Sequence, residues 1–171
     1  MPRTPRFLLV AASLAVAFNA AFAAAPGAAF AVEPAPVLLH NGERFLRMGN
    51  LGFAQANYDK LIAHYEDTPE AAEAHSDLGV IAARQGDDAL AIAEYEKALA
   101  VGDYPLAHFN LGQALLRKLD KQDDPALKAQ ARAHFLAFEA YLKSGEPRPP
   151  ILTYSLQEVE AELAAALKRL Q

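Results

Sequence analysis

Cysteine is absent from this chain of 171 residues. Without cysteine there is no disulfide framework and no thiolate metal site. A bacterial lipoprotein is excluded as well, because its lipid is carried by a cysteine. The absence does not identify the compartment, since proteins without disulfides also occur in oxidising surroundings.

The residue patterns of common active sites are also absent. The sequence has no glycine-rich phosphate loop, no Gly-x-Ser-x-Gly elbow and no His-Glu-x-x-His motif. Its histidines show no i, i+4 pair or other ligand-like spacing, which favours a structural role for them. They are His40, His64, His75, His108 and His134. We therefore predict no catalytic residue, no metal, no cofactor and no enzymatic activity.

Basic residues are fewer than acidic ones. The chain has 16 lysines and arginines against 21 aspartates and glutamates, a formal net charge of −5. All the acidic residues follow position 31, so loss of the first 31 residues with Arg3 and Arg6 would make the chain more acidic still. Binding to nucleic acid or to anionic lipid requires a basic face, which this balance does not favour.

The N-terminus has the order of segments found in a secretory signal peptide. Arg3 and Arg6 precede an apolar run over residues 7–18, and small residues stand at minus three and minus one of two cleavage points, after Ala23 and after Ala31. We predict a signal peptide within residues 1–31, cleaved after residue 23 or 31. The composition, rich in alanine and proline, indicates a bacterial source, and the expected location is the periplasm.

An uncleaved membrane anchor is the alternative for this segment. Residues 7–25 carry no charge and approach the length that spans a bilayer. Alanine dominates the stretch, Asn19 interrupts it and Pro26 ends it, so its hydrophobicity is low for a stable span. These features favour cleavage, and the mature form is expected to have no integral membrane span.

The most informative positive feature is an internal repeat. Residues 74–79 read AHSDLG, and residues 107–112 read AHFNLG, 33 positions later. A period in the low thirties is typical of stacked helical hairpins. The same register extends upstream and downstream, with Gly86 and Gly49 at turns and a longer turn in the third unit. Its repeated positions are Leu38, Asn41, Gly42, Phe45, Ala54, Tyr58 and Leu61; Leu78, Gly79, Ala82, Ala91, Tyr95 and Ala98; and Leu111, Gly112, Leu115, Ala131, Phe135 and Phe138.

These residues resemble the tetratricopeptide repeat, whose pattern places Leu-Gly on the first helix and Ala-x3-Phe/Tyr on the second. The second unit fits best, with Leu78-Gly79 followed by Ala91 and Tyr95. The resemblance covers residues 36–145 and implies an all-α fold. It implies tandem helix-turn-helix units in a short right-handed superhelix with a concave binding groove.

The residue types also predict how the units pack. Glycine and alanine on one helix let another backbone approach closely, while large aromatics such as Tyr58, Tyr95 and Phe135 fill the space between hairpins. Gly49 and Gly86 are placed where a first helix ends, a position that favours a left-handed glycine. The third unit has seven extra residues around 118–125, which we interpret as a surface insertion.

The C-terminal part is predicted to cap the array. Proline-rich residues 144–150 cannot continue a helix. Ser155 and Glu158 then form a capping box at the start of an amphipathic helix, which either covers the last repeat or is offered to a partner or a second copy. The expected segments are three repeats within 32–145 (36–68, 69–103 and 104–145), a break at 146–153 and a capping helix at 154–171.

The candidate partner-binding residues come from the groove that the resemblance implies. Arg47, Arg84 and Arg117 share one position near the end of each first helix, where they would suit a carboxylate-bearing segment. The alternative is that each guanidinium only stabilises a helix C-terminus. Further groove positions are Leu39, His40, Glu43, Asp77, Val80, Phe109, Asn110 and Gln113, with Phe109 expected to be exposed. The predicted partner-binding set is Arg47, Asp77, Arg84, Phe109, Asn110, Gln113 and Arg117.

Two functions are consistent with these patterns. The first is an exported adaptor, scaffold or assembly factor that binds another envelope protein or a peptide segment in the groove. The second is a structural envelope protein that self-associates through the groove or the last helix. A monomer or a weak homo-oligomer is expected, and no nucleic acid is expected as a partner.

Overall fold

The computed structural model describes residues 32–147 and 155–171. This part of the chain contains seven helices and no strand. They are α1 (Ala35–Arg47), α2 (Leu51–Tyr65), α3 (Pro69–Arg84), α4 (Asp88–Val101), α5 (Pro105–Leu119), α6 (Pro125–Ser144) and α7 (Leu156–Arg169). The predicted signal peptide and most of the predicted break lie outside the described residues.

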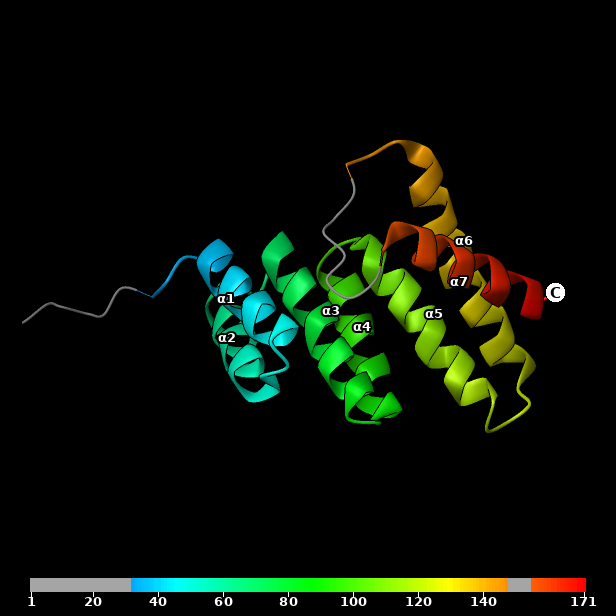
Figure 1. The fold of residues 1–171 in the computed structure, drawn as a ribbon, viewed down its shortest axis with the longest axis horizontal. Coiled ribbons are helices and arrows are strands. Elements are labelled where there is room, and N and C mark those ends of the chain that lie inside the picture. Colours follow the sequence, from blue (N-terminus) through cyan, green and yellow to red (C-terminus); the bar gives the residue numbers. More distant parts are fainter. Residues whose placement is uncertain (1–31, 148–154) are drawn as a thin grey trace, which may run out of the picture. The chain divides into compact units, whose positions relative to one another are not determined.

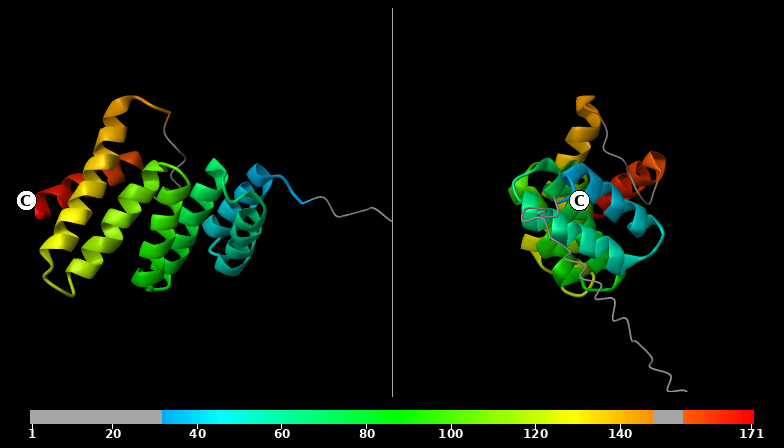
Figure 2. Two further views of the ribbon diagram at one scale, coloured as in Figure 1. Left: turned by 180° about the vertical axis from the view of Figure 1, so that it is seen from behind. Right: turned by 90° about the vertical axis from the view of Figure 1, so that its left-hand side faces the viewer.

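The helices pack as consecutive pairs, as Figures 1 and 2 show. Within a pair, α1 contacts α2, α3 contacts α4 and α5 contacts α6. The second helix of one pair then contacts the first helix of the next, and the first helices α1, α3 and α5 are neighbours in turn. This is the arrangement of a helical repeat solenoid, and it confirms the predicted all-α fold of tandem hairpins.

Each pair is held together by a glycine on the first helix and an aromatic ring on the second. A Cβ atom built on Gly42 would lie 2.3 Å from the ring of Tyr58, and one on Gly79 would lie 2.4 Å from the ring of Tyr95. In the third pair, a Cβ on Gly112 would lie 2.8 Å from Phe135. The three rings are buried. The predicted packing of small against large residues is therefore confirmed.

Two glycines end the first helices of the first two pairs. Gly49, with φ of 74°, follows α1, and Gly86, with φ of 83°, follows α3. The left-handed region is costly for other L residues. The prediction that these glycines terminate the first helices is confirmed.

The seven extra residues of the third unit do not simply lengthen its turn. Compared with α3 and α4, α5 continues further past the glycine of the repeat register, to Leu119, and α6 begins further before Ala131, at Pro125. Most of the insertion therefore extends helices, and the expectation of a purely longer turn was wrong. The Asp124 carboxylate caps α6 by accepting hydrogen bonds from the amides of Ala126 and Leu127, at 2.8 and 3.3 Å.

The last helix covers the third pair. The capping box is present, because Ser155 accepts from the Glu158 amide at 3.3 Å and Glu158 accepts from the Ser155 amide at 2.6 Å. One face of α7 joins the buried cluster that contains Phe135 and Phe138, and Arg169 pairs with Asp120. Its buried residues in that cluster are Val159, Leu163, Ala166 and Leu170. The predicted capping helix is confirmed.

Over residues 32–147 and 155–171, none of the helices combines the length and the apolar character needed to cross a membrane.

Candidate partner-binding site

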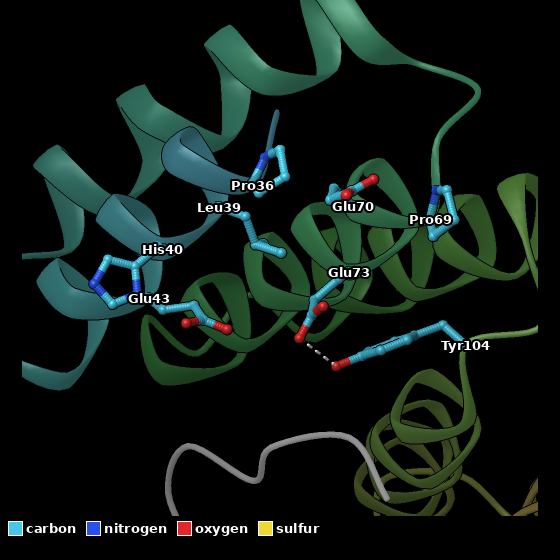
Figure 3. A pocket seen from close by; sticks show the side chains of 8 residues that line it. All are labelled: Pro36, Leu39, His40, Glu43, Pro69, Glu70, Glu73 and Tyr104. Carbon is cyan, nitrogen blue, oxygen red and sulfur yellow. Dashed lines mark hydrogen bonds between the residues drawn. The ribbon is translucent and has the colours of Figure 1, made fainter. Parts of the chain in front are cut away.

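A pocket of about 370 Å³ opens where α1, α3 and the start of α5 meet (Figure 3). It lies on the neighbouring first helices, where the sequence places the groove. Its walls come from segments far apart in the chain: Pro36, Leu39, His40 and Glu43 of α1, Pro69, Glu70 and Glu73 of α3, and Tyr104 before α5. Three of these residues, Leu39, His40 and Glu43, are predicted groove positions.

Local helix signals place the apolar part of the wall. Pro69 is the first residue of α3, where the missing amide of proline costs nothing, and Thr68 before it caps the helix by accepting from the Ala71 amide at 3.3 Å. Tyr104 stands at the N-cap of α5, in front of another first-position proline. The α1 residues Pro36 and Leu39 complete an apolar surface at one side of the pocket.

Carboxylates form the opposite part of the wall. Figure 3 shows Glu43 and Glu73 turned towards the same opening, with Glu70 one turn before Glu73 on α3. Glu43, Glu70 and Glu73 are all half-buried. The Tyr104 hydroxyl donates a hydrogen bond of 2.9 Å to Glu73.

The surroundings of Glu73 disfavour its charged form. Burial raises the pKa of Glu73 most, the hydrogen bond from Tyr104 opposes that rise, and the carboxylates of Glu43 and Glu70 add to it. Burial also raises the pKa of the Tyr104 hydroxyl, and Glu73 raises it further. The pocket therefore brings like charges together in a partly desolvated place.

Asp77 lies one turn beyond Glu73 on α3 and is buried, with 6% of its surface exposed. The Tyr58 hydroxyl donates a hydrogen bond of 2.6 Å to its carboxyl group. Burial raises the pKa of Asp77 to about 7; Tyr58 and Arg84 lower it, while Glu73 and Glu43 raise it. Asp77 thus extends the acidic character of the pocket into the packed interior.

Few cations stand near these carboxylates. In the described part of the chain, the ion pairs of Glu43, Glu70 and Glu73 are limited to Glu43 with Arg47, whose Nη1 lies 3.8 Å from Glu43 Oε2. Arg47 is exposed and one helical turn away on the same helix. The pocket as a whole is acidic.

The predicted arginine row makes contacts between helices. Arg84 Nη1 donates to the carbonyl oxygen of Leu46 at the end of α1, at 3.4 Å. Arg117 Nε donates to Asp88 Oδ1 at the start of α4, at 2.7 Å. A structural role for these side chains near helix ends is the alternative that the geometry favours. Partner binding by Arg47, Arg84 and Arg117 stays a prediction.

Two other predicted groove residues are buried. Phe109 packs against Phe135 and Phe138, with ring centroids 6.0 and 5.2 Å apart, and has 4% of its surface exposed. The expectation that Phe109 is exposed was wrong, because this side of α5 faces α6 and belongs to the cluster that α7 completes. Asp77, placed in the groove by its register, is likewise buried, under the contact with Tyr58.

The remaining two predicted residues are half-buried on α5. Gln113 Nε2 donates to Glu162 Oε2 of α7 at 3.2 Å, so this side chain faces the capping helix. Asn110 lies one turn before it. The pocket and the α5 part of the predicted set are therefore different places, and binding at Asn110 and Gln113 stays a prediction.

Sequence reasoning missed five pocket residues: Pro36, Pro69, Glu70, Glu73 and Tyr104. A signal for two of them was present. Glu70, Glu73 and Asp77 are spaced by three and four residues, so they share one face of α3. Because the repeat register places Asp77 in the groove, the same spacing points to Glu70 and Glu73 as its acidic neighbours.

Polar contacts between helices account for several histidines. His75 Nδ1 lies 2.7 Å from Glu94 Oε2, and Lys97 donates to the other oxygen of Glu94 at 2.7 Å. His108 lies between His134 and Asp103, at 2.9 Å from each. Across the described ranges, no group of three or more histidines and carboxylates is arranged to hold a metal ion.

Comparison with known proteins identifies the repeat. Residues 39–105 match the tetratricopeptide repeat family. This part of the chain is a tetratricopeptide repeat array. It includes all the α1 and α3 residues of the pocket except Pro36.

A solved structure resembles the repeat array and its flanking helices. It is the type III secretion chaperone SycD of Yersinia enterocolitica, in complex with a peptide of the translocator YopD. The TM-score is 0.58 at 18% sequence identity, and the match covers 79% of this chain and 90% of the other. At that identity the likeness shows the fold. No curated protein matches the sequence of the chain.

Proposed function

We propose that this protein is a non-enzymatic protein-protein interaction module, an exported adaptor or assembly factor that holds a segment of a partner protein on its first helices. The pocket formed by α1, α3 and Tyr104 is the observation that carries the proposal. Its volume of about 370 Å³ is near the low end of small-molecule sites, roughly 300–1,000 Å³. This size suits one or two side chains of an extended segment.

Two findings support a peptide as the occupant. The tetratricopeptide repeat array holds α1 and α3 next to each other, and the α1 residues Pro36 and His40 at the rim of the pocket are exposed. SycD, which shares the fold, was solved with a peptide of its partner. An extended chain makes main-chain and side-chain contacts with several helices of such an array.

The proposed location is the bacterial periplasm. The support is the order of segments in residues 1–31: two arginines, an apolar run, and small residues at the cleavage points after Ala23 and Ala31. The partner would then be another envelope protein. Fusion of residues 1–31 to a reporter that is active only after export tests this, and a reporter that stays inactive would contradict it.

Selection from a random peptide library tests the binding function. The full chain is immobilised, enriched peptides are synthesised, and their affinities are measured by fluorescence anisotropy. We expect Leu39→Trp, which fills the pocket, to weaken binding, and Leu90→Trp on the exposed side of α4 to leave it unchanged. Absence of any enriched peptide, or equal affinities for the two variants, would contradict the proposal.

Self-association is the second candidate, and one observation favours it. At the α1–α2 turn, Met48 and Phe53 are 71% and 60% exposed, and Phe53 stacks on Phe45 with ring centroids 5.3 Å apart. Exposed large apolar side chains of this kind often mark contacts between proteins. Sedimentation at two concentrations separates the candidates: a mass that rises with concentration and falls back in Phe53→Ser supports self-association.

A further inference from the structure

We infer that the pocket selects a lysine or arginine side chain of the partner segment. The inference rests on the proposed function and adds the chemistry of the residue that is recognised. It reverses the polarity that the arginine row suggests, since those arginines contact neighbouring helices while the pocket is lined by carboxylates.

The first argument is the uncompensated charge of the pocket. Glu43 of α1 and Glu70 and Glu73 of α3 converge from two helices, with Asp77 buried behind them. Like charges in a partly desolvated place repel one another, and the cost falls when a cation enters. In the described part of the chain, the exposed Arg47 is the cation within ion-pair distance of this trio, and it reaches Glu43 from outside the pocket at 3.8 Å.

The second argument is the apolar wall beside the carboxylates. Leu39, Pro36 and Pro69 offer a surface along which the methylene stem of a lysine or arginine can lie. The Tyr104 ring borders the same space, and its hydroxyl is already directed to Glu73. A side chain with an apolar stem and a cationic end therefore matches both halves of the pocket.

A bare metal ion matches the pocket less well than such a side chain. Over the described residues, no three carboxylates or histidines are close enough together to hold a metal. Hydrophobic walls give a hydrated ion nothing to bind, whereas an extended peptide brings its own backbone to the exposed rim at Pro36 and His40. The occupant that we propose is thus a basic residue within a peptide.

The test compares peptide selection on the full chain with selection on two variants of equal charge. Glu43→Gln/Glu70→Gln removes two pocket carboxylates and leaves the Tyr104–Glu73 hydrogen bond in place. Glu96→Gln/Glu160→Gln removes two exposed carboxylates from α4 and α7. Each enriched peptide is then synthesised with its basic residue and with glutamine or glutamate at that place, and the affinities are measured by anisotropy.

We expect peptides enriched in lysine or arginine on the wild type, and an affinity loss of at least about tenfold when the basic residue becomes glutamine. The pocket variant should lose that discrimination, while the control variant should keep it. Circular dichroism checks folding of both, and Glu70→Gln alone serves if the double variant does not fold.

Other outcomes overturn the inference in distinguishable ways. Peptides that bind with no preference for basic residues, or that prefer glutamate, contradict the basic occupant and leave the binding function standing. Loss of discrimination in the Glu96→Gln/Glu160→Gln control would show that only overall charge matters. Displacement of the lysine peptide by calcium at low concentration would assign the pocket to a metal. A library with no enriched peptide contradicts both the inference and the proposed function.

Discussion

The Tyr58 hydroxyl donates a hydrogen bond of 2.6 Å to the buried carboxyl group of Asp77 and so joins α2 to α3. Asp77 is held beside Glu73 and Glu43, and burial raises its pKa from 3.8 to about 7. Its proton is therefore bound more tightly in the folded chain than in the unfolded chain.

This difference predicts how stability depends on pH. An acid with a raised folded pKa destabilises the fold when it ionises, so its contribution is most favourable below about pH 4 and is lost as pH rises to about 7. At 1.36 kcal/mol per pKa unit, the loss from Asp77 is at most about 4 kcal/mol. We expect Asp77→Asn, whose amide oxygen still accepts from Tyr58, to remove this part of the dependence.

Urea unfolding of both proteins at about pH 5 and about pH 8 measures it. Glu73 also has a raised pKa and contributes with the same sign in both proteins, so the difference between them isolates Asp77. Free energies of unfolding that change in parallel for wild type and Asp77→Asn would contradict the prediction.

The contact of Gly79 with Tyr95 predicts the effect of a single methyl group. Gly79→Ala places a Cβ atom 2.4 Å from the ring, so the ring or the helix must move. We expect a loss of about 1–3 kcal/mol in the free energy of unfolding. Gly52→Ala is the matched control, because a Cβ there meets nothing within 4 Å on helix α2, and a gain of about 0.5–1 kcal/mol is expected. Similar values for the two variants would contradict the close packing.

The buried face of α7 gives a third prediction. Leu163 belongs to the cluster that α7 shares with α5 and α6. We expect Leu163→Ala to lower the free energy of unfolding by about 2–4 kcal/mol. Leu90→Ala, at a position 47% exposed on α4, should change it by less than about 0.5 kcal/mol. An unaltered Leu163→Ala protein would mean that α7 is offered to a partner rather than packed.

The ion pair of Arg117 with Asp88 gives a fourth prediction. Arg117 Nε lies 2.7 Å from Asp88, but its side chain is 42% exposed, so solvent screens the pair. A double-mutant cycle with Arg117→Gln and Asp88→Asn should give a coupling of about 0.5–1 kcal/mol. The pair Arg47–Glu43, at 3.8 Å within one helix, is the comparison and should couple more weakly. Zero coupling for Arg117 would return this side chain to the candidates for partner binding.

Much of the fold could be predicted because its signals are local. The spacing of Gly79 and Tyr95 recurs in Gly42 and Tyr58, and the helix-ending glycines recur at Gly49 and Gly86. Each signal involves residues within one hairpin, where helix geometry alone decides which side chains meet. The capping box of Ser155 with Glu158 is local in the same sense.

The candidate site was predicted only in part, because it joins three hairpins. The repeat register placed Leu39, His40 and Glu43 on the groove side, where the pocket lies. Tyr104 enters the pocket from the N-cap of α5, and its contact with Glu73 spans 31 residues. No pattern within one helix indicates that contact.

The amino-acid sequence by itself determined the helices, their pairing and the aromatic rings between them, since each depends on a repeat of short range. Only the tertiary structure decided that Phe109 is covered, that Asp77 is bonded to Tyr58, and that Arg117 is paired with Asp88. The reason is physical: helix periodicity assigns a residue to a face, whereas burial and charge pairing depend on which other helices pack against that face.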